Sequence, residues 1–305
     1  FVVALGAALW ATDAPIRKPL ADKLPATSIV FAEHLFLALY GLPVLLWQRR
    51  TLQRLSSRGW LALLVIAWGA SGLATVLFTA AFRIGNPTTV ILLQKVQPLI
   101  AVLLAAALLR ERLPRLYWPC FVAALAGAYL VSFGRDVLEP LWLLPRERIL
   151  TALLALSAAT LWGSATVLGR YVLTTVPFPV LAAARFVLAL PFLAVLALVE
   201  GTFVRTFTVG LAQDAPRLFF LALVPGLIAM LVYYLGLRHT RASYATLAEL
   251  AFPALAIVVN WLTLGATIDL VQLAGFVILW MAITALSWIP APAPAGEPRP
   301  ATPVT

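Results

Sequence analysis

Six ionisable residues lie inside long apolar stretches of this chain, where a charge is costly unless something offsets it. They are Asp13, Glu33, His34, Lys95, Arg185 and Glu249. In a hydrocarbon layer each charged group costs about 2.5–3.5 kcal/mol on insertion scales, so each needs an internal partner or a wet cavity. Acids, bases and an imidazole in such positions can bind a polar solute or carry a proton.

Lys95 and Glu249 are spaced to meet each other or a shared ligand. Lys95 lies about 14 Å into its apolar segment and Glu249 about 12 Å into its own, at ~1.5 Å per residue. If the two segments enter from opposite faces, both side chains reach the middle of the layer. They predict either a clamp for a zwitterion, with Lys95 facing a carboxylate and Glu249 an ammonium, or a salt bridge that only neutralises two buried charges.

Asp13 lies two residues before Pro15, which has no backbone N–H and can break a helix. Broken helices in a membrane place free backbone groups at binding sites. Asp13 is therefore a candidate to bind an ammonium or a proton. The alternative, which the spacing favours, is that it pairs with Arg17, one helical turn later.

Glu33 and His34 are neighbours about 10 Å into the second apolar segment, and they point about 100° apart on a helix. Because histidine titrates near neutral pH, these two residues and Asp13 predict a proton-coupling site. The alternative is a plain ion pair of Glu33 with one of three cations, Arg185, Arg17 or Lys18.

Other residues are candidates for the lining of a binding site. Arg185 can hold a carboxylate with two hydrogen bonds, or it can belong to the scaffold. Aromatic faces suit stacked rings, and amides inside lipid need hydrogen-bond partners, although each aromatic residue can equally serve packing. The predicted substrate-binding set is Lys95, Glu249, Arg185, Trp10, Trp162, Phe78, Tyr234, Tyr244, Gln94 and Gln97.

The composition identifies the environment of these residues. Of 305 residues, 63% are hydrophobic and 11% are charged, with a mean hydropathy of +0.98. A soluble domain is roughly 45–50% apolar and about 25% charged. The composition excludes a soluble enzyme and a disordered chain.

Polar breaks divide the chain into ten segments, each near the ~20 residues that a membrane-spanning helix needs. The segments are continuously apolar, without the alternation of barrel strands. They are 1–21, 26–47, 59–82, 86–109, 114–134, 148–172, 178–200, 215–237, 241–264 and 268–289. Residues 290–305 lack packing side chains and are expected to form a disordered tail.

The basic residues predict the orientation. Four arginines lie in the connection 47–59 and three in 110–115, and both connections fall on the same side. Positive loops face the cytoplasm, so both termini are predicted to be cytoplasmic. Since the net charge of +10 is explained by such loops, no nucleic-acid partner is expected.

The second half of the chain repeats the pattern of the first. Leu9-Trp10-Ala11-Thr12 matches Leu161-Trp162-Gly163-Ser164, His34 to Leu39 matches Arg185 to Leu190, and 83–101 matches 238–256. Five helices per half is an odd number, so the halves, 1–134 and 148–289, enter the membrane in opposite directions. Inverted repeats of this kind surround a substrate site near the bilayer midplane.

In their order and spacing these motifs resemble the drug/metabolite transporter superfamily, specifically the ten-helix EamA-type permeases. The resemblance covers residues 1–289 and implies export or exchange of small metabolites such as amino acids, in a bacterial inner membrane. Two departures are Ala266, where a second glutamate like Glu111 is expected, and Glu33-His34, where an arginine is expected. The motifs are Leu9-Trp10, Leu161-Trp162-Gly163, Arg185-Phe186, Gln97-Pro98-Leu99, Leu109-Arg110-Glu111-Arg112-Leu113, Phe252-Pro253-Ala254, Gly127 and Gly275.

The sequence thus predicts an all-α integral membrane protein with ten transmembrane helices in two inverted five-helix repeats. We expect a transporter of small metabolites, foremost amino acids including aromatic or hydrophobic ones, that works by alternating access. The alternative is a proton-coupled exporter of organic cations. Lipid surrounds the chain, one copy carries both repeats and suffices as a monomer, and no cofactor or metal is expected. Motifs of hydrolases, metalloproteases and P-loop enzymes are absent from the sequence, so it is not expected to be an enzyme.

Overall fold

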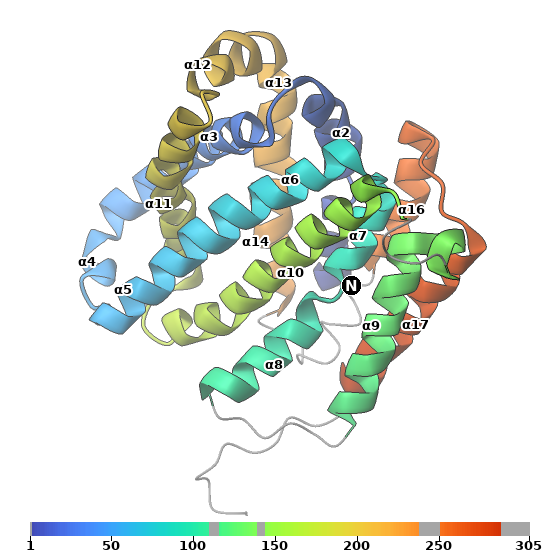
Figure 1. Cartoon of the computed structure of the whole chain (residues 1–305). Helices are drawn as coiled ribbons and strands as arrows, with labels where there is room; N and C mark the ends of the chain where they lie inside the picture. The colour runs from blue at the N-terminus through green and yellow to red at the C-terminus, as the bar shows by residue number, and fades with distance from the viewer. Residues whose placement is uncertain (1, 110–115, 139–143, 238–250, 288–305) are drawn as a thin grey trace, which may run out of the picture.

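The structure is a computed structural model that describes residues 2–109, 116–138, 144–237 and 251–287. Within these ranges every regular element is a helix (Figure 1). Up to residue 138 the helices are α1 Val2–Trp10, α2 Asp13–Lys23, α3 Ala26–Trp47, α4 Arg49–Leu52, α5 Ser57–Leu64, η1 Val65–Leu73, α6 Ala74–Ile84, α7 Pro87–Gln94, α8 Gln97–Leu109, α9 Tyr117–Phe133 and η2 Gly134–Leu138. From residue 144 they are α10 Arg146–Leu173, α11 Phe178–Val199, α12 Phe203–Arg205, η3 Thr206–Leu211, α13 Ala212–Leu221, η4 Ala222–Ile228, α14 Ala229–Leu237, α16 Ala251–Leu264 and α17 Leu270–Ser287.

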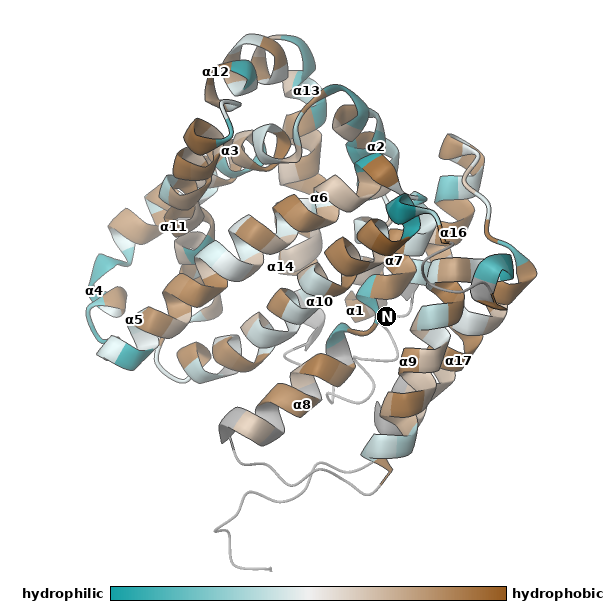
Figure 2. Cartoon of the chain, in the orientation of Figure 1, coloured by the Kyte–Doolittle hydropathy of each residue, from teal (hydrophilic) through white to brown (hydrophobic). Residues whose placement is uncertain are grey.

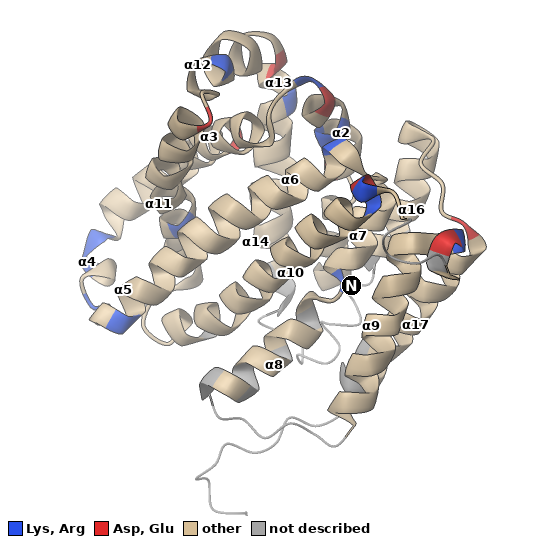
Figure 3. Ribbon diagram, in the orientation of Figure 1, with Lys and Arg blue, Asp and Glu red and all other residues tan. Residues whose placement is uncertain are grey.

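Six described helical stretches are long and apolar enough to cross a membrane. Hydrophobic residues follow these helices (Figure 2), while lysine, arginine, aspartate and glutamate gather mostly near helix ends (Figure 3). A helix satisfies its own backbone hydrogen bonds, which a hydrocarbon layer requires. The six stretches are Ala26–Trp47, Ser57–Ile84, Tyr117–Asp136, Arg146–Leu173, Phe178–Val199 and Phe203–Tyr233.

The first and fourth predicted segments are each broken in the middle. α1 and α2 are separated at residues 11–12, and α7 and α8 at residues 95–96. Proline causes both breaks, because Pro15 and Pro98 have no N–H to donate to the carbonyl four residues earlier. The sequence predicts the first break; the second corrects the expectation of a continuous fourth helix.

The eighth and ninth segments also differ from expectation. The eighth, predicted from 215, begins at Phe203 and runs to Leu237 with a kink at Asp214. The polar residues near the kink look like a loop in the sequence, but the apolar residues before them continue the helix. Residues 241–250 of the ninth segment and the tail 290–305 lie outside the described residues.

Helices from the first part of the chain pack mainly on helices from the second. α3 packs along α11, α9 along α17, α1 against α14 and α16, and α10 against α6, α7 and α8. Glycines allow the closest approaches, as small residues do in membranes. A Cβ on Gly127 would lie 2.6 Å from the Gly275 carbonyl oxygen, and one on Gly6 would lie 2.5 Å from the Tyr233 backbone nitrogen.

Candidate functional site

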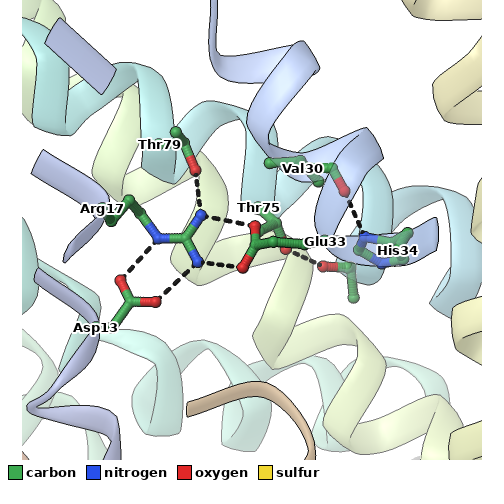
Figure 4. A network of polar contacts seen from close by, with 8 residues as sticks. Asp13, Arg17, Val30, Glu33, His34, Thr75 and Thr79 are labelled. Atoms are coloured by element: carbon green, nitrogen blue, oxygen red, sulfur yellow. Dashed lines mark hydrogen bonds and ion pairs between the residues drawn. The ribbon is translucent and has the colours of Figure 1, made fainter. Parts of the chain in front are cut away.

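Arg17 lies at the centre of a buried ionic cluster between α2, α3 and α6 (Figure 4). Its Nε and Nη2 donate to the two carboxylate oxygens of Asp13, each at 2.7 Å. Nη2 and Nη1 donate to the two oxygens of Glu33 at 2.8 and 2.9 Å, and Nη1 also donates to Thr79 Oγ1 at 2.9 Å. A guanidinium has five N–H donors, so all of them are used.

The cluster is shielded from solvent. The side chains of Arg17, Glu33 and Asp13 are 5%, 6% and 15% exposed. Asp13 and Arg17 are one turn apart on α2, and Glu33 arrives from α3 after the chain turns back at Leu24 and Pro25. Paired hydrogen bonds between a guanidinium and a carboxylate are among the strongest in proteins. The cluster therefore ties α2 to α3 and α6.

This geometry shows which cation each of the two acids pairs with. Asp13 pairs with Arg17, one turn later, and Glu33 pairs with Arg17 among the three cations considered for it. Lys18 pairs instead with Asp22. The predicted set of site residues omits Arg17, although its spacing from Asp13 is the signal that identifies it.

His34 lies on the far side of Glu33 from Arg17 (Figure 4). Its Nδ1 is 2.8 Å from the Val30 carbonyl oxygen and donates a hydrogen bond to it. The residue is 4% exposed, and Nε2 has no hydrogen-bond partner within the described ranges. Although adjacent to Glu33 in sequence, His34 is not part of the cluster.

A second group of residues gathers where the two broken helices meet the second half of the chain. Trp10 ends α1, and its ring centre lies 5.3 Å from that of Tyr233 and 6.1 Å from that of Phe252. Lys95 directly follows α7, is 8% exposed, and places Nζ 4.5 Å from the centre of the Phe252 ring. We call Trp10, Lys95, Tyr233 and Phe252 the aromatic site.

Trp10 and Lys95 belong to the predicted binding set, whereas Tyr233 and Phe252 do not. Phe252 precedes Pro253 in the stretch that repeats the region around Pro98, which is the one sequence signal for it. The sequence favours Tyr234, whose side chain lies outside the described part of the chain. Its neighbour Tyr233 makes the ring contact with Trp10.

Two predicted amides flank Lys95. Gln94 ends α7, and its Oε1 is buried without a hydrogen-bond partner among the described residues. Gln97 begins α8 and is half-buried. A buried acceptor without a partner is costly, so Gln94 is suited to accept a hydrogen bond from a ligand or a water molecule.

Phe78 and Trp162 form a separate aromatic contact between α6 and α10. Their ring centres are 5.1 Å apart, and Trp162 Nε1 donates to the Ala70 carbonyl oxygen at 2.9 Å. Phe78 is 7% exposed. Trp162 occupies the position in the repeat that corresponds to Trp10, but in the continuous helix α10 it anchors packing.

Arg185 lies on α11 and donates from Nε to Ser71 Oγ at 2.7 Å. Its guanidinium is 5.9 Å from the centre of the Phe186 ring. Ser71 belongs to η1, so Arg185 links the second half of the chain to the first.

Glu249 and Tyr244 lie outside the described residues, so the predicted relation between Lys95 and Glu249 stays a prediction. Within the described ranges, no three histidine, cysteine, aspartate or glutamate residues are grouped so that they could hold a metal ion.

Apolar spanning helices, buried charges and paired helix breaks define a polytopic membrane protein with polar groups in its interior, a class that includes the secondary transporters. The EamA-like transporter family matches this chain over residues 1–133 and 149–288. The chain belongs to the EamA-like transporter family. The predicted fold class, an all-helical membrane protein of the two-repeat type, is confirmed.

Two known proteins are similar over nearly the whole chain. Riboflavin transporter ImpX of Fusobacterium nucleatum is 30% identical over 292 residues, covering 94% of this chain and 96% of that protein. A protein of known crystal structure matches with a TM-score of 0.61 at 18% identity, covering 94% of this chain and 96% of the other. The second likeness shows the fold alone, while the family membership shows a transporter.

Proposed function

We propose that this protein transports a flat aromatic metabolite with hydrogen-bonding edges, and that riboflavin is the substrate to test first. The observation that carries the proposal is the aromatic site, in which Lys95 lies over Phe252 and Trp10 packs beside it. The 30% identity with a riboflavin transporter supports the same class of substrate.

The groups at the aromatic site suit the chemistry of a flavin. Its three fused rings are flat and carry carbonyl oxygens and a ring N–H, and its ribityl chain carries hydroxyl groups. A ring face that stacks on Trp10 or Phe252 gains about 0.5–1.5 kcal/mol per aromatic pair beyond buried area. Lys95 donates to a ring carbonyl, and Gln94 Oε1 accepts from the ring N–H. An uncharged ligand also needs no donor from Arg17, whose five donors are occupied.

The sequence predicts amino acids, because the family resemblance implies them and because Lys95 and Glu249 can clamp a zwitterion. Glu249 lies outside the described residues, whereas the structure describes the contacts of Trp10 and Phe252. Aromatic amino acids share the flat ring and are therefore the second candidate. An organic cation has less support, because the relative that is 30% identical is named as a riboflavin transporter.

Alternating access at this site is part of the proposal. Residues 11–12 and 95–96 interrupt two helices beside the aromatic site, and their carbonyl groups lie outside regular helices. Helix segments on either side can tilt there with little loss of backbone hydrogen bonding, as in other transporters with discontinuous helices. Closure from either face then covers the same site.

Trp10→Ala is expected to lower riboflavin uptake into proteoliposomes about tenfold at low substrate concentration, because one stacking surface is lost. Uptake of labelled riboflavin by purified protein measures it. Trp118→Ala is the matched control, since that ring is 55% exposed on the outside of α9 and should leave uptake unchanged.

Equal loss of uptake in both tryptophan variants would place the effect outside the aromatic site. If the folded parent protein takes up phenylalanine or tryptophan saturably but takes up no riboflavin, the substrate is an aromatic amino acid and not riboflavin.

We also propose that both termini and the connection 47–59 face the cytoplasm of a bacterial inner membrane, as the arginine bias indicates. In a Cys120→Ala background, Arg50→Cys should react with an impermeant maleimide only after spheroplasts are broken. Glu147→Cys, at the opposite membrane face, should react in intact spheroplasts; both residues are exposed. The reverse labelling pattern would show that the protein has the opposite orientation in the membrane.

A further inference from the structure

The Arg17 cluster contains two acids and one base. Arg17 supplies one positive charge to the carboxylates of Asp13 and Glu33, so the cluster has an excess negative charge when both are ionised. The hydrogen bonds that Asp13 and Glu33 make in the described structure all come from Arg17. Burying an unbalanced charge is costly, so the second carboxylate needs a further positive charge.

The surrounding helices do not supply that charge within the described residues. α6, α11, α13, α16, η3 and η4 contact α2 or α3, and of these α16, η3 and η4 carry no titratable side chain. On α2, α3, α6, α11 and α13, the titratable groups outside the cluster have other contacts or are partly or fully exposed. Lys18 pairs with Asp22, and Arg217 pairs with Asp214. Arg185 donates to Ser71, His34 lies against the Val30 carbonyl oxygen, Tyr40 is half-buried, and Lys23 and Arg83 are exposed.

The cluster exists in one half of the chain only. The repeat places Ala165 opposite Asp13 and Ala184 opposite Glu33, and both alanines lie in continuous helices of the second half. A five-helix unit of this family therefore folds without buried acids at these positions. The cluster also coincides with the broken first helix, whereas α10, its counterpart, is unbroken.

We propose that the Arg17 cluster binds one proton, on a carboxylate oxygen of Glu33, and that this proton crosses the membrane together with the substrate. The inference rests on the proposed transport function. The proton comes from water on one side, forms an O–H bond on Glu33, and returns to water on the other side. Glu33 is the acceptor because its side chain is less exposed than that of Asp13, 6% against 15%, and its ionised form has lost more hydration.

The break at residues 11–12 connects this proton to the aromatic site. Asp13 begins α2 on one side of the break, and Trp10 ends α1 on the other. Ionised Glu33 holds Arg17, and with it α2, firmly against α3. Neutral Glu33 holds Arg17 less firmly, so α2 tilts at the break and moves Trp10 relative to Tyr233 and Phe252.

The test is accumulation of riboflavin in proteoliposomes with an acidic exterior and the membrane potential held at zero. With one proton per substrate, a gradient of ~1 pH unit sustains up to about a tenfold concentration ratio. Parent protein should reach a ratio well above one, and a protonophore should abolish it. Glu33→Gln, which resembles the protonated state, should only equilibrate riboflavin, while its exchange of labelled for unlabelled riboflavin continues.

Asp22→Asn is the matched control, because it removes a carboxylate from the same helix that pairs with Lys18 at the surface. It should accumulate riboflavin like the parent. Parent protein that equilibrates riboflavin without responding to the gradient would overturn proton coupling and leave the transport function standing. Gradient-driven accumulation by Glu33→Gln would also overturn it.

Infrared spectroscopy tests the proton without any substrate. Parent protein should show the C=O stretch of a protonated carboxyl group that titrates with pH, and this band should be missing in Glu33→Gln but present in Asp22→Asn. A band unchanged in Glu33→Gln would overturn the assignment even if riboflavin proves not to be the substrate. Asp13→Asn leaves Glu33 alone with Arg17 and removes the excess negative charge, so the band should titrate at a lower pH than in the parent protein. This variant serves if Glu33→Gln does not fold, and a band that titrates as in the parent would overturn the proposal.

Discussion

Arg17→Ala is expected to abolish most of the folded protein. The substitution leaves two carboxylates, on Asp13 and Glu33, without their shared partner in a place where the side chains are 15% and 6% exposed. Removing one partner of a buried ion pair costs about 3–5 kcal/mol. The tie between α2, α3 and α6 is lost at the same time, so the loss should exceed that of any surface charge. The yield of monodisperse protein in detergent and its thermal transition measure the effect.

Removing the acids together with the base tests whether the uncompensated charges cause the loss of stability. The triple variant Arg17→Met, Asp13→Asn and Glu33→Gln contains no uncompensated charge and should recover much of the lost stability, as replaced buried ion pairs often do. Lys18→Ala is the control on the same helix, and because its ion pair with Asp22 is partly exposed it should change stability little. A stable Arg17→Ala protein would show that the three side chains do not form the described cluster.

Gly127→Ala is expected to destabilise the protein, although it adds only a single methyl group. The added Cβ would lie 2.6 Å from the carbonyl oxygen of Gly275 and 2.9 Å from the backbone nitrogen of Leu279. Both neighbours are backbone atoms, so α9 and α17 must separate, and overpacking of this kind costs about 1–3 kcal/mol. Thermal unfolding in detergent should show a lower transition temperature.

The matched control is the same substitution at Gly169 in α10, where an added Cβ meets no atom within 4 Å. Alanine is a better helix former than glycine by roughly 0.5–1 kcal/mol, so Gly169→Ala should be neutral or stabilising. We expect Gly127→Ala to lower the transition temperature and Gly169→Ala to leave it unchanged or raise it. A neutral Gly127→Ala would mean that α9 and α17 do not cross as closely as described.

Much of the fold could be predicted because a membrane restricts what a chain can do. Runs of about 20 apolar residues have to be helices in hydrocarbon. Pro15 predicted the first helix break, and the spacing of Asp13 and Arg17 predicted their pairing. The sequence does not predict the break at Lys95, although Pro98 follows it, because the apolar residues on both sides add up to one segment of membrane-spanning length.

The site was harder to predict than the fold. Lys95 and Trp10 stand out by residue type and depth. Phe252 stands out only by its place in the motif before Pro253, which does not reveal that it contacts Lys95 and Trp10. Glu33 had three cations within plausible reach, and sequence spacing favoured none of them. The pairing with Arg17 depends on how the turn at Leu24 and Pro25 sets α3 against α2.

The sequence by itself determined the membrane environment, most of the helices, the repeat and the residues whose charges need partners, because hydrophobicity and proline act locally along the chain. Only the tertiary structure decided that Arg17 serves two acids and that Lys95 lies over Phe252. In a soluble protein one face of a helix is polar and exposed, so the opposite, apolar face is known to be buried. In lipid the outer face is apolar as well, so the pattern along a helix does not reveal which residues meet across helices.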